Sequence, residues 1–146
     1  MPKMQVIREF SISDIETITE LMSDLAHPAS KEQMQKRLEK ITSNPMYCTF
    51  VAEREGKVVG MVGLRQLYSY EGDDPVIQIS ALVTKTEYRG LGIGKELIKQ
   101  AEKWARENGA NVIVLTSGNR PEHEEAHQFY KHLGYTVSGF RFSKRL

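Results

Sequence analysis

The spacing of hydrophobic positions changes several times along the chain, and each change marks a different predicted element. Residues 4–10 have the pattern of a short strand. Residues 11–26 and 30–41 then carry apolar side chains at the spacing of an amphipathic helix. Each helical pattern opens with a capping-box pair, a serine followed three residues later by Glu or Gln: Ser13 with Glu16, and Ser30 with Gln33. The sequence therefore predicts two consecutive helices after the first strand.

Three strand-like segments occupy the middle of the chain. Residues 47–53 and 57–68 are rich in aromatic and β-branched side chains, and Gly56 lies between them, where a tight hairpin turn requires glycine. We therefore expect these two segments to pair antiparallel. Residues 75–84 form a third and longer strand pattern.

The C-terminal part alternates between helix and strand. A helical pattern ends at Gly109, and the continuous apolar run over residues 111–117 is typical of a strand that is buried on both faces. Residues 121–134 begin with a proline and end with a glycine, which predicts a last helix. Residues 135–142 predict a last strand. Helices and strands thus alternate along the whole chain.

The composition is that of an ordinary globular domain. The 146 residues fit a single domain over residues 1–146. Twenty basic and 19 acidic residues leave a formal net charge of +1, so we expect neither nucleic acid nor a membrane as a partner. No signal peptide or membrane-spanning run is recognisable, and the one cysteine, Cys48, has the apolar neighbours of a buried thiol. These features favour a cytoplasmic protein.

The most informative stretch lies between the third strand pattern of the middle segment and the helix that follows it. Gly90, Gly92 and Gly94 let several backbone N–H groups approach one point, next to the positive end of the helix dipole. Arg89 and Lys95 add positive charge there. The stretch therefore predicts a binding site for phosphate groups.

The spacing of these residues disfavours two common nucleotide-binding motifs. A dinucleotide-binding fingerprint would place its third glycine at position 95, which is Lys95. A P-loop would need glycine at position 89 and Ser or Thr after the lysine, but the chain has Arg89 and Glu96. The phosphate group is therefore not expected to belong to a nucleoside triphosphate.

The spacing that fits is R-x-x-G-x-G, formed by Arg89, Gly92 and Gly94, and it resembles the motif of the GNAT superfamily of acyl-CoA N-acyltransferases. The later segment 126–135, AHQFYKHLGY, is similar to the family's fourth helix and the turn after it. The order of the predicted elements is also similar. The resemblance implies a GNAT fold of the α/β (mixed α+β) class. Its central sheet, mixed but mostly antiparallel, would have six to seven strands, flanked by about four helices.

The resemblance also implies a reaction and its coenzyme. Acetyl-CoA would be the co-substrate, without a metal, and the primary amine of a small molecule or protein would attack the thioester directly. Homodimers occur in the family. The glycine loop would hold the pyrophosphate, the end of the preceding strand would pair with the pantetheine arm, and a later asparagine side chain would hold the pantetheine. The implied coenzyme-binding residues are Leu82, Val83, Thr84, Arg89, Gly90, Leu91, Gly92, Ile93, Gly94, Lys95 and Asn119. His127, one turn before Tyr130, is a further candidate to line the coenzyme cleft.

Tyr130 matches the position of the family's general acid. A phenol stays protonated at neutral pH and can give a proton to the departing thiolate. The alternative for Tyr130 is packing within the apolar face of its helix. A backbone N–H near Leu82 or Val83 would stabilise the oxyanion. The sequence does not single out a general base, and the candidate carboxylates are Glu53, Glu71, Asp73 and Asp74.

The acceptor amine has one candidate entrance. Tyr68 and Tyr70 stand beside Glu71, Asp73 and Asp74 in the segment before residue 75. Aromatic faces and carboxylates together attract a cationic amine. A solvated loop is the alternative for the same residues.

Two other functions come from different classes. Residues 123–127, HEEAH, match the H-E-x-x-H pattern of zinc peptidases. The extended zinc pattern requires glycine at position 130 and histidine at position 133, but the chain has Tyr130 and Leu133, which disfavours a zinc hydrolase. A non-catalytic domain that binds acyl-CoA as a sensor, or binds a protein partner, stays an alternative because no general base is assigned.

Overall fold

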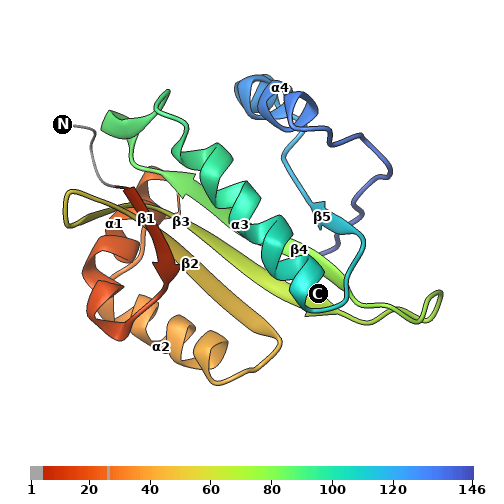
Figure 1. Ribbon diagram of the computed structural model, residues 1–146, viewed down its shortest axis with the longest axis horizontal. Helices are drawn as coiled ribbons and strands as arrows, with labels where there is room; N and C mark the ends of the chain where they lie inside the picture. The colour runs from red at the N-terminus through yellow and green to blue at the C-terminus, as the bar shows by residue number, and fades with distance from the viewer. Residues whose placement is uncertain (1–4, 26) are drawn as a thin grey trace. The chain divides into compact units, whose positions relative to one another are not determined.

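The computed structural model describes residues 5–25 and 27–146 (Figure 1). Met4, the first residue of the predicted first strand, and Ala26, the last of the predicted first helix, lie outside the described residues. The strands are β1 (Gln5–Glu9), β2 (Tyr47–Arg54), β3 (Lys57–Leu67), β4 (Val76–Thr84) and β5 (Ile113–Leu115). The α-helices are α1 (Ile15–Asp24), α2 (Lys31–Thr42), α3 (Ile93–Glu107) and α4 (Glu124–His132). Short 3-10 turns are η1 (Ile12–Asp14), η2 (Thr86–Tyr88) and η3 (Pro121–His123).

The chain divides into two compact units, one that ends at Val114 and one over Leu115–Leu146, and each is described by itself. The strands follow one another in the sheet in the order β1-β2-β3-β4-β5. The pairs β1–β2, β2–β3 and β3–β4 are antiparallel. Within the first unit, α1 and α2 lie on one side of these strands and α3 on the other (Figure 1). This is the α/β class that the sequence predicts.

Two apolar layers hold the first unit together. On one face, Ile18 and Leu21 of α1 and Leu38 of α2 pack against strand residues that include Val51 and Met61. On the other face, α3 buries an apolar stripe made of Ile93, Leu97, Ile98, Ala101 and Ala105. Each large aliphatic side chain that is removed from water contributes about 1.5–3 kcal/mol. Within residues 5–25 and 27–146, no helix is long and apolar enough to cross a membrane.

Two local predictions are confirmed. Between β2 and β3, Glu55 and Gly56 have φ angles of +52° and +80°, which makes the tight hairpin turn. At the start of α2, the Gln33 N–H donates to Ser30 Oγ at 3.1 Å, and the Ser30 N–H donates to Gln33 Oε1 at 2.9 Å. This is the predicted capping box of the second helix.

The cap of the first helix was predicted wrongly, by two residues. Ser11, not Ser13, starts the turn, and its N–H donates to Asp14 Oδ2 at 2.8 Å. The Ser13 hydroxyl only donates to Ser11 Oγ, at 3.2 Å. The expected partner, Glu16, instead forms an ion pair with Lys31 at 2.9 Å.

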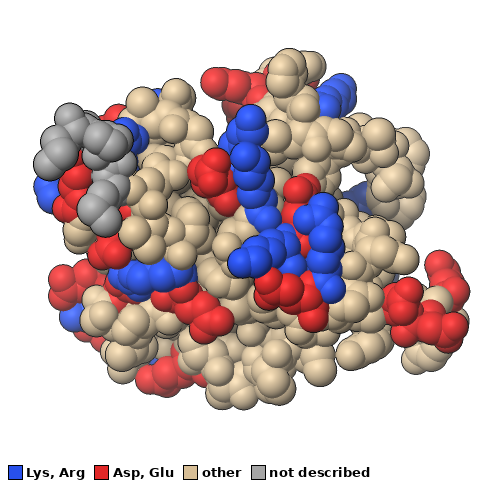
Figure 2. All heavy atoms as spheres, viewed as in Figure 1, with Lys and Arg blue, Asp and Glu red and all other residues tan. Residues whose placement is uncertain are grey.

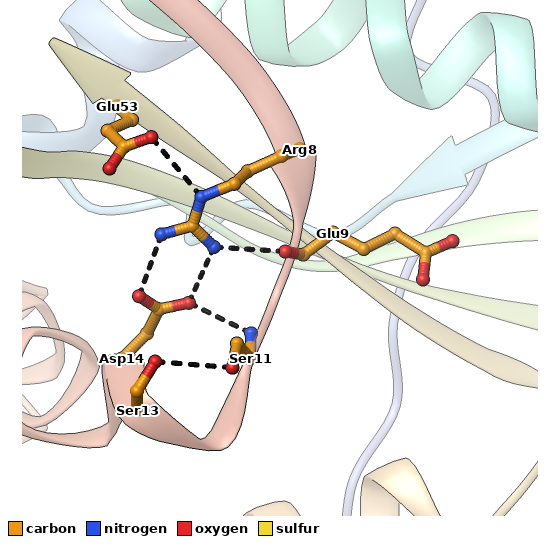
Figure 3. A network of polar contacts seen from close by, with 6 residues as sticks. All are labelled: Arg8, Glu9, Ser11, Ser13, Asp14 and Glu53. Carbon is orange, nitrogen blue, oxygen red and sulfur yellow. Dashed lines mark hydrogen bonds and ion pairs between the residues drawn. The ribbon is translucent and has the colours of Figure 1, made fainter. Parts of the chain in front are cut away.

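Arg8 of β1 explains this shift (Figure 3). Its Nη1 and Nη2 donate to the two carboxylate oxygens of Asp14 at 2.8 and 2.9 Å, and its Nε donates to Glu53 at 3.3 Å. The hydrogen bonds from Arg8 hold the pKa of Asp14 below its ordinary value. Arg8 thus fixes Asp14 as the capping carboxylate and ties β1 to η1 and β2.

The C-terminal strands are shorter than predicted. β5 has three residues, and Val114 is 36% exposed, so this run is not buried on both faces. The described chain forms no strand over residues 135–142, where Val137, Phe140 and Phe142 are 81%, 90% and 92% exposed. Aromatic and β-branched side chains favour a strand only where a neighbouring strand supplies the hydrogen-bond ladder. The described sheet therefore has five strands and not six to seven.

Charged side chains over α3 are mixed in sign (Figure 2). Lys99 lies 3.6 Å from Glu96, and Lys103 lies 3.8 Å from Glu107. Figure 2 also shows a group of acidic side chains at the tip of the loop between β3 and β4. The exposed carboxylates of that loop are Glu71, Asp73 and Asp74.

Candidate functional site

The segment between β4 and α3 forms a surface loop with two glycines in the left-handed region. Gly90 and Gly92 both have a φ angle of +82°. Residues with a side chain rarely adopt this conformation. A Cβ added at either position would meet no atom within 4 Å, so the backbone conformation, and not a lack of space, requires glycine.

Helix α3 begins at the end of this loop without a side-chain cap. The Glu96 N–H donates to the Gly92 carbonyl at 3.1 Å. The N–H groups of Ile93, Gly94 and Lys95 precede this bond, so the helix itself supplies no acceptor for them. They lie at the positive end of the helix dipole. The start of α3 can therefore hold an anionic group such as a phosphate.

The side chains of the loop divide between surface and core. Arg89 and Lys95 are exposed, and Leu91 is 52% exposed. Ile93 is buried at 1% exposure and anchors the first turn of α3 on the sheet. Ile93, Gly94 and Lys95 belong to the first turn of α3, and the two charged side chains lie on the surface.

Gly60 of β3 is a residue of this site that the sequence interpretation missed. A Cβ added to Gly60 would lie 3.1 Å from Ile93 Cγ2, 3.1 Å from the Val83 carbonyl oxygen and 3.2 Å from Leu97 Cδ1. These distances are shorter than ordinary contacts, so the glycine lets the first turns of α3 rest directly on the backbone of β3. An isolated glycine inside a strand pattern is the signal that could have identified it.

The end of β4 holds the three strand residues predicted to contact the coenzyme. Leu82, Val83 and Thr84 pair with the middle of β3. The register shifts between Gly63 and Leu64, which leaves Ser80 of β4 without a partner in the ladder, and Ser80 is exposed. Such a bulge bends a strand and changes the direction of its side chains. The predicted coenzyme-contacting end of β4 therefore follows directly after a bulge.

Tyr130 belongs to α4 in the second unit. Its ring makes edge contacts with Phe129 and Tyr135, at centroid distances of 5.3 and 6.0 Å. Burial raises the pKa of the Tyr130 phenol. The helix ends as predicted at Gly134, which has a φ angle of +93°. Tyr130 is therefore protonated at neutral pH, as a general acid must be.

The two histidines of the HEEAH segment lie around the backbone of Gly118. His127 Nε2 is 2.7 Å from the Gly118 carbonyl oxygen. A carbonyl only accepts, so Nε2 donates the proton and is not free to bind a metal. His123 precedes α4 in a 3-10 turn, and its ring lies 2.6 Å from where a Cβ on Gly118 would be. The described residues contain no group of three or more His, Cys, Asp or Glu that could hold a metal ion.

The remaining predicted side chains are placed as follows. Asn119 is exposed in the loop before η3. Glu53, a candidate base, is hydrogen-bonded to Arg8, whereas the other candidate carboxylates are exposed in the β3–β4 loop. Cys48 is half-buried, and burial raises its pKa to about 11, so it is not a nucleophile at neutral pH.

Comparison with known proteins matches residues 15–135 to the acetyltransferase (GNAT) family. The chain belongs to this family. The predicted GNAT resemblance is thus confirmed, and it agrees with the glycine loop at the start of α3.

This GNAT chain is similar to several named proteins. It is 36% identical to the aminoalkylphosphonate N-acetyltransferase of Salmonella typhimurium over 96 residues, which cover 66% of this chain and 61% of the relative. A solved GNAT acetyltransferase from Staphylococcus aureus is 30% identical with a TM-score of 0.84, over 97% of this chain and 98% of that chain. An aminoglycoside N-acetyltransferase solved in complex with CoA has a TM-score of 0.87 over 100% of this chain and 97% of that chain, at 18% identity. At this low identity, the similarity to the aminoglycoside N-acetyltransferase shows the fold alone.

Proposed function

We propose that this GNAT chain transfers an acetyl group from acetyl-CoA to the primary amine of a small molecule or protein. The observation that carries the proposal is the loop of Gly90 and Gly92, which leads into an α3 N-terminus without a side-chain cap. The pyrophosphate of coenzyme A is an anionic group that such N–H donors suit. Membership of a family of acetyltransferases supports the same assignment.

The coenzyme would lie along the loop and the end of β4. The N–H groups of Arg89 through Lys95 would hold the pyrophosphate, with the two exposed basic side chains adding charge. The amide groups of the pantetheine arm would pair with the backbone of Leu82, Val83 and Thr84. Asn119 and His127 would line the coenzyme cleft.

The reaction would proceed in two steps. The lone pair of the neutral amine attacks the thioester carbonyl carbon, a C–N bond forms, and the carbonyl oxygen takes the negative charge. A backbone N–H near Leu82 or Val83 stabilises this oxyanion. The carbonyl then re-forms, the C–S bond breaks, and the thiolate takes the proton of the Tyr130 hydroxyl. The amine nitrogen loses its extra proton to water, and that proton later restores Tyr130.

The acceptor would enter with its amine as a cation before it loses a proton. The β3–β4 loop exposes three carboxylates together with Tyr68 and Tyr70, which are 68% and 109% exposed. This group can attract an ammonium ion. The relative from Salmonella is named for an acceptor that joins an amine to a phosphonate, which supports a small charged acceptor.

Release of free thiol from acetyl-CoA in the presence of a panel of amines tests the proposal. We expect thiol release that depends on both acetyl-CoA and one class of primary amine. Binding of acetyl-CoA without amine-dependent release would instead support a non-catalytic sensor. Loss of activity on dialysis against a chelator would support a metal-dependent reaction.

The Tyr130→Phe variant tests the proposed general acid. We expect kcat to fall by about 100-fold, because general acid catalysis typically contributes at least that factor, and the affinity for acetyl-CoA to change by less than about twofold. Parallel loss of rate and affinity would assign Tyr130 to packing. Tyr135→Phe, which removes the hydroxyl from the ring in edge contact with Tyr130, is the matched control.

A further inference from the structure

Three polar side chains meet on one face of the sheet. Tyr47 of β2 pairs with Arg65 of β3, and Arg65 pairs with Gln78 of β4. Directly paired residues point to the same side, so these side chains lie next to one another. Met61, four residues before Arg65 in β3, points the same way and packs in the core under α1 and α2. The three polar residues therefore continue the face that α1 and α2 cover.

Arg65 is held in this row by uncharged groups. Its Nη2 donates to Gln78 Oε1, and its Nη1 makes a long contact of 3.5 Å to the Tyr47 hydroxyl. The guanidinium carbon lies 5.9 Å from the centre of the Tyr47 ring. Arg65 Nε is buried and has no partner. None of the ion pairs within the described ranges includes Arg65.

A half-buried guanidinium without a counter-ion has lost part of its hydration and gained no opposite charge. Arginine has five N–H donors. Two of the donors of Arg65 are used by Tyr47 and Gln78, and the Nε donor is enclosed. Two N–H groups on the Nη atoms are left. A phosphonate or carboxylate can accept both, because these anions match the spacing of the guanidinium donors.

The sheet surface next to Arg65 is partly covered but leaves room above Gly63. Gly63 lies two residues before Arg65 on the same face, and a Cβ added there would meet only Ala81, at 3.9 Å. Helices α1 and α2 therefore place no atom within 4 Å of that point. Gly63 and Ala81 are paired across β3 and β4, between the Arg65–Gln78 pair and the end of β4 at Leu82 to Thr84. This pair of small residues forms a floor with Arg65 at one end.

We propose that Arg65 binds the anionic group of the acceptor, a phosphonate or carboxylate, and thereby selects amines that carry such a group. The inference rests on the proposed function, because it names the acceptor class of that same reaction. The acceptor lies over Gly63 and Ala81, its anion contacts the guanidinium, and its amine points toward the thioester near Leu82. Tyr47 and Gln78 are positioning residues that hold Arg65 in place.

The test compares two amines that carry an anionic group with one that does not. The full chain and acetyl-CoA are assayed with 3-aminopropylphosphonate, 3-aminopropanoate and propylamine, and kcat/KM is measured for each. We expect the two anionic amines to exceed propylamine by at least about tenfold, since a charge-assisted hydrogen bond contributes about that factor. The ratio of phosphonate to carboxylate identifies which anion Arg65 prefers.

The Arg65→Gln variant should reduce kcat/KM for both anionic amines by about 10- to 100-fold, mainly through KM. Its rate with propylamine should change by less than about threefold, and its affinity for acetyl-CoA should stay the same. Arg65→Lys should recover part of the loss because it keeps the charge. Arg106→Gln, which removes the same charge from an exposed position of α3, is the matched control.

A second variant tests the floor independently of Arg65. Gly63→Leu should fill the open surface and reduce kcat/KM for all three amines by at least about tenfold, with unchanged acetyl-CoA affinity. Equal loss on propylamine and on the anionic amines in Arg65→Gln would overturn the inference. So would a wild-type enzyme without preference for the anionic amines, and the proposed function would then stand alone.

Failure of the proposed function gives a different result. If no amine is acetylated, calorimetric titration of the wild type and of Arg65→Gln with 3-aminopropylphosphonate decides the inference. Binding that the substitution abolishes supports an anion site at Arg65 in a non-catalytic protein. Equal binding to both proteins, or binding to neither, would overturn it.

Discussion

Arg8 and Arg65 lie on the same face of one sheet, but their partners differ in charge. Arg8 donates to the carboxylates of Asp14 and Glu53, and Asp14 is only 7% exposed. Arg65 contacts a hydroxyl and an amide. The charge of Arg8 is neutralised inside the fold, whereas that of Arg65 is not. The same residue type can therefore serve stability at one place and recognition at another, and the partners distinguish the two roles.

The elements next to the two arginines also differ. Arg8 faces η1, the turn that leads into α1, which it helps to cap, and its side chain is 32% exposed (Figure 3). Arg65 borders Gly63, above which α1 and α2 leave room. The contrast lies in the partners and not in the exposure, because both arginines are half-buried.

The largest expected effect separates the two arginines by stability. Arg8→Met leaves the buried Asp14 carboxylate without its partner, and we expect a loss of about 3 kcal/mol in the free energy of unfolding. Arg65→Met removes a charge that has no counter-ion, so the loss should stay within about 1 kcal/mol. Urea unfolding of both variants at pH 7 measures the two values. Similar losses would mean that Arg65 also has a mainly structural role.

A smaller effect on stability separates Gly60, which α3 covers, from Gly63, where a methyl group has room. In Gly60→Ala, the new methyl group would lie 3.1 Å from Ile93 Cγ2 and from the Val83 carbonyl, and we expect overpacking to cost about 1–3 kcal/mol. The displaced first turn of α3 should also bind acetyl-CoA more weakly. Gly63→Ala is the matched control, because its methyl group has room, and it should change stability by less than about 1 kcal/mol.

Thermal unfolding and calorimetric titration with acetyl-CoA check both glycine variants. Normal coenzyme affinity in a destabilised Gly60→Ala would separate the packing of α3 from its role in binding. A destabilised Gly63→Ala would mean that the floor is occupied within the fold, which contradicts an open acceptor surface.

Sequence patterns predicted the elements whose determinants are local. The cap of α2 depends on Ser30 and Gln33, three residues apart, and the hairpin depends on the φ angle of Gly56. The glycine loop before α3 is local in the same sense, because Gly90 and Gly92 each need a left-handed conformation. These features could be read from a few neighbouring residues, and the structure has them.

Features that depend on distant residues could not be read in this way. The cap of the first helix is decided by Arg8, whose other partner, Glu53, is 45 residues away. The row of Tyr47, Arg65 and Gln78 depends on the register of three strands. Its signal in the sequence is the presence of the polar residues Arg65 and Gln78 inside strand patterns. The last strand was expected from composition alone, but a strand needs a partner ladder that composition does not specify. The roles of Tyr130, Asn119 and His127 stay predictions.

The smallest expected effect is a difference in pH dependence between the two arginine sites. The folded-state pKa of Asp14 is lowered, so this carboxylate contributes stability above its unfolded pKa, near 3.8, and the contribution is lost as pH falls through the folded pKa. Unfolding free energy should therefore decrease on acidification below about pH 5. Asp14→Asn should be less stable at pH 7 and should lose less on acidification. Arg65→Met should follow the wild-type profile in parallel, because no carboxylate pairs with Arg65. A steeper or flatter profile in Arg65→Met, measured by urea unfolding from pH 7 to pH 3, would reveal an acidic partner and remove the contrast between the two arginines.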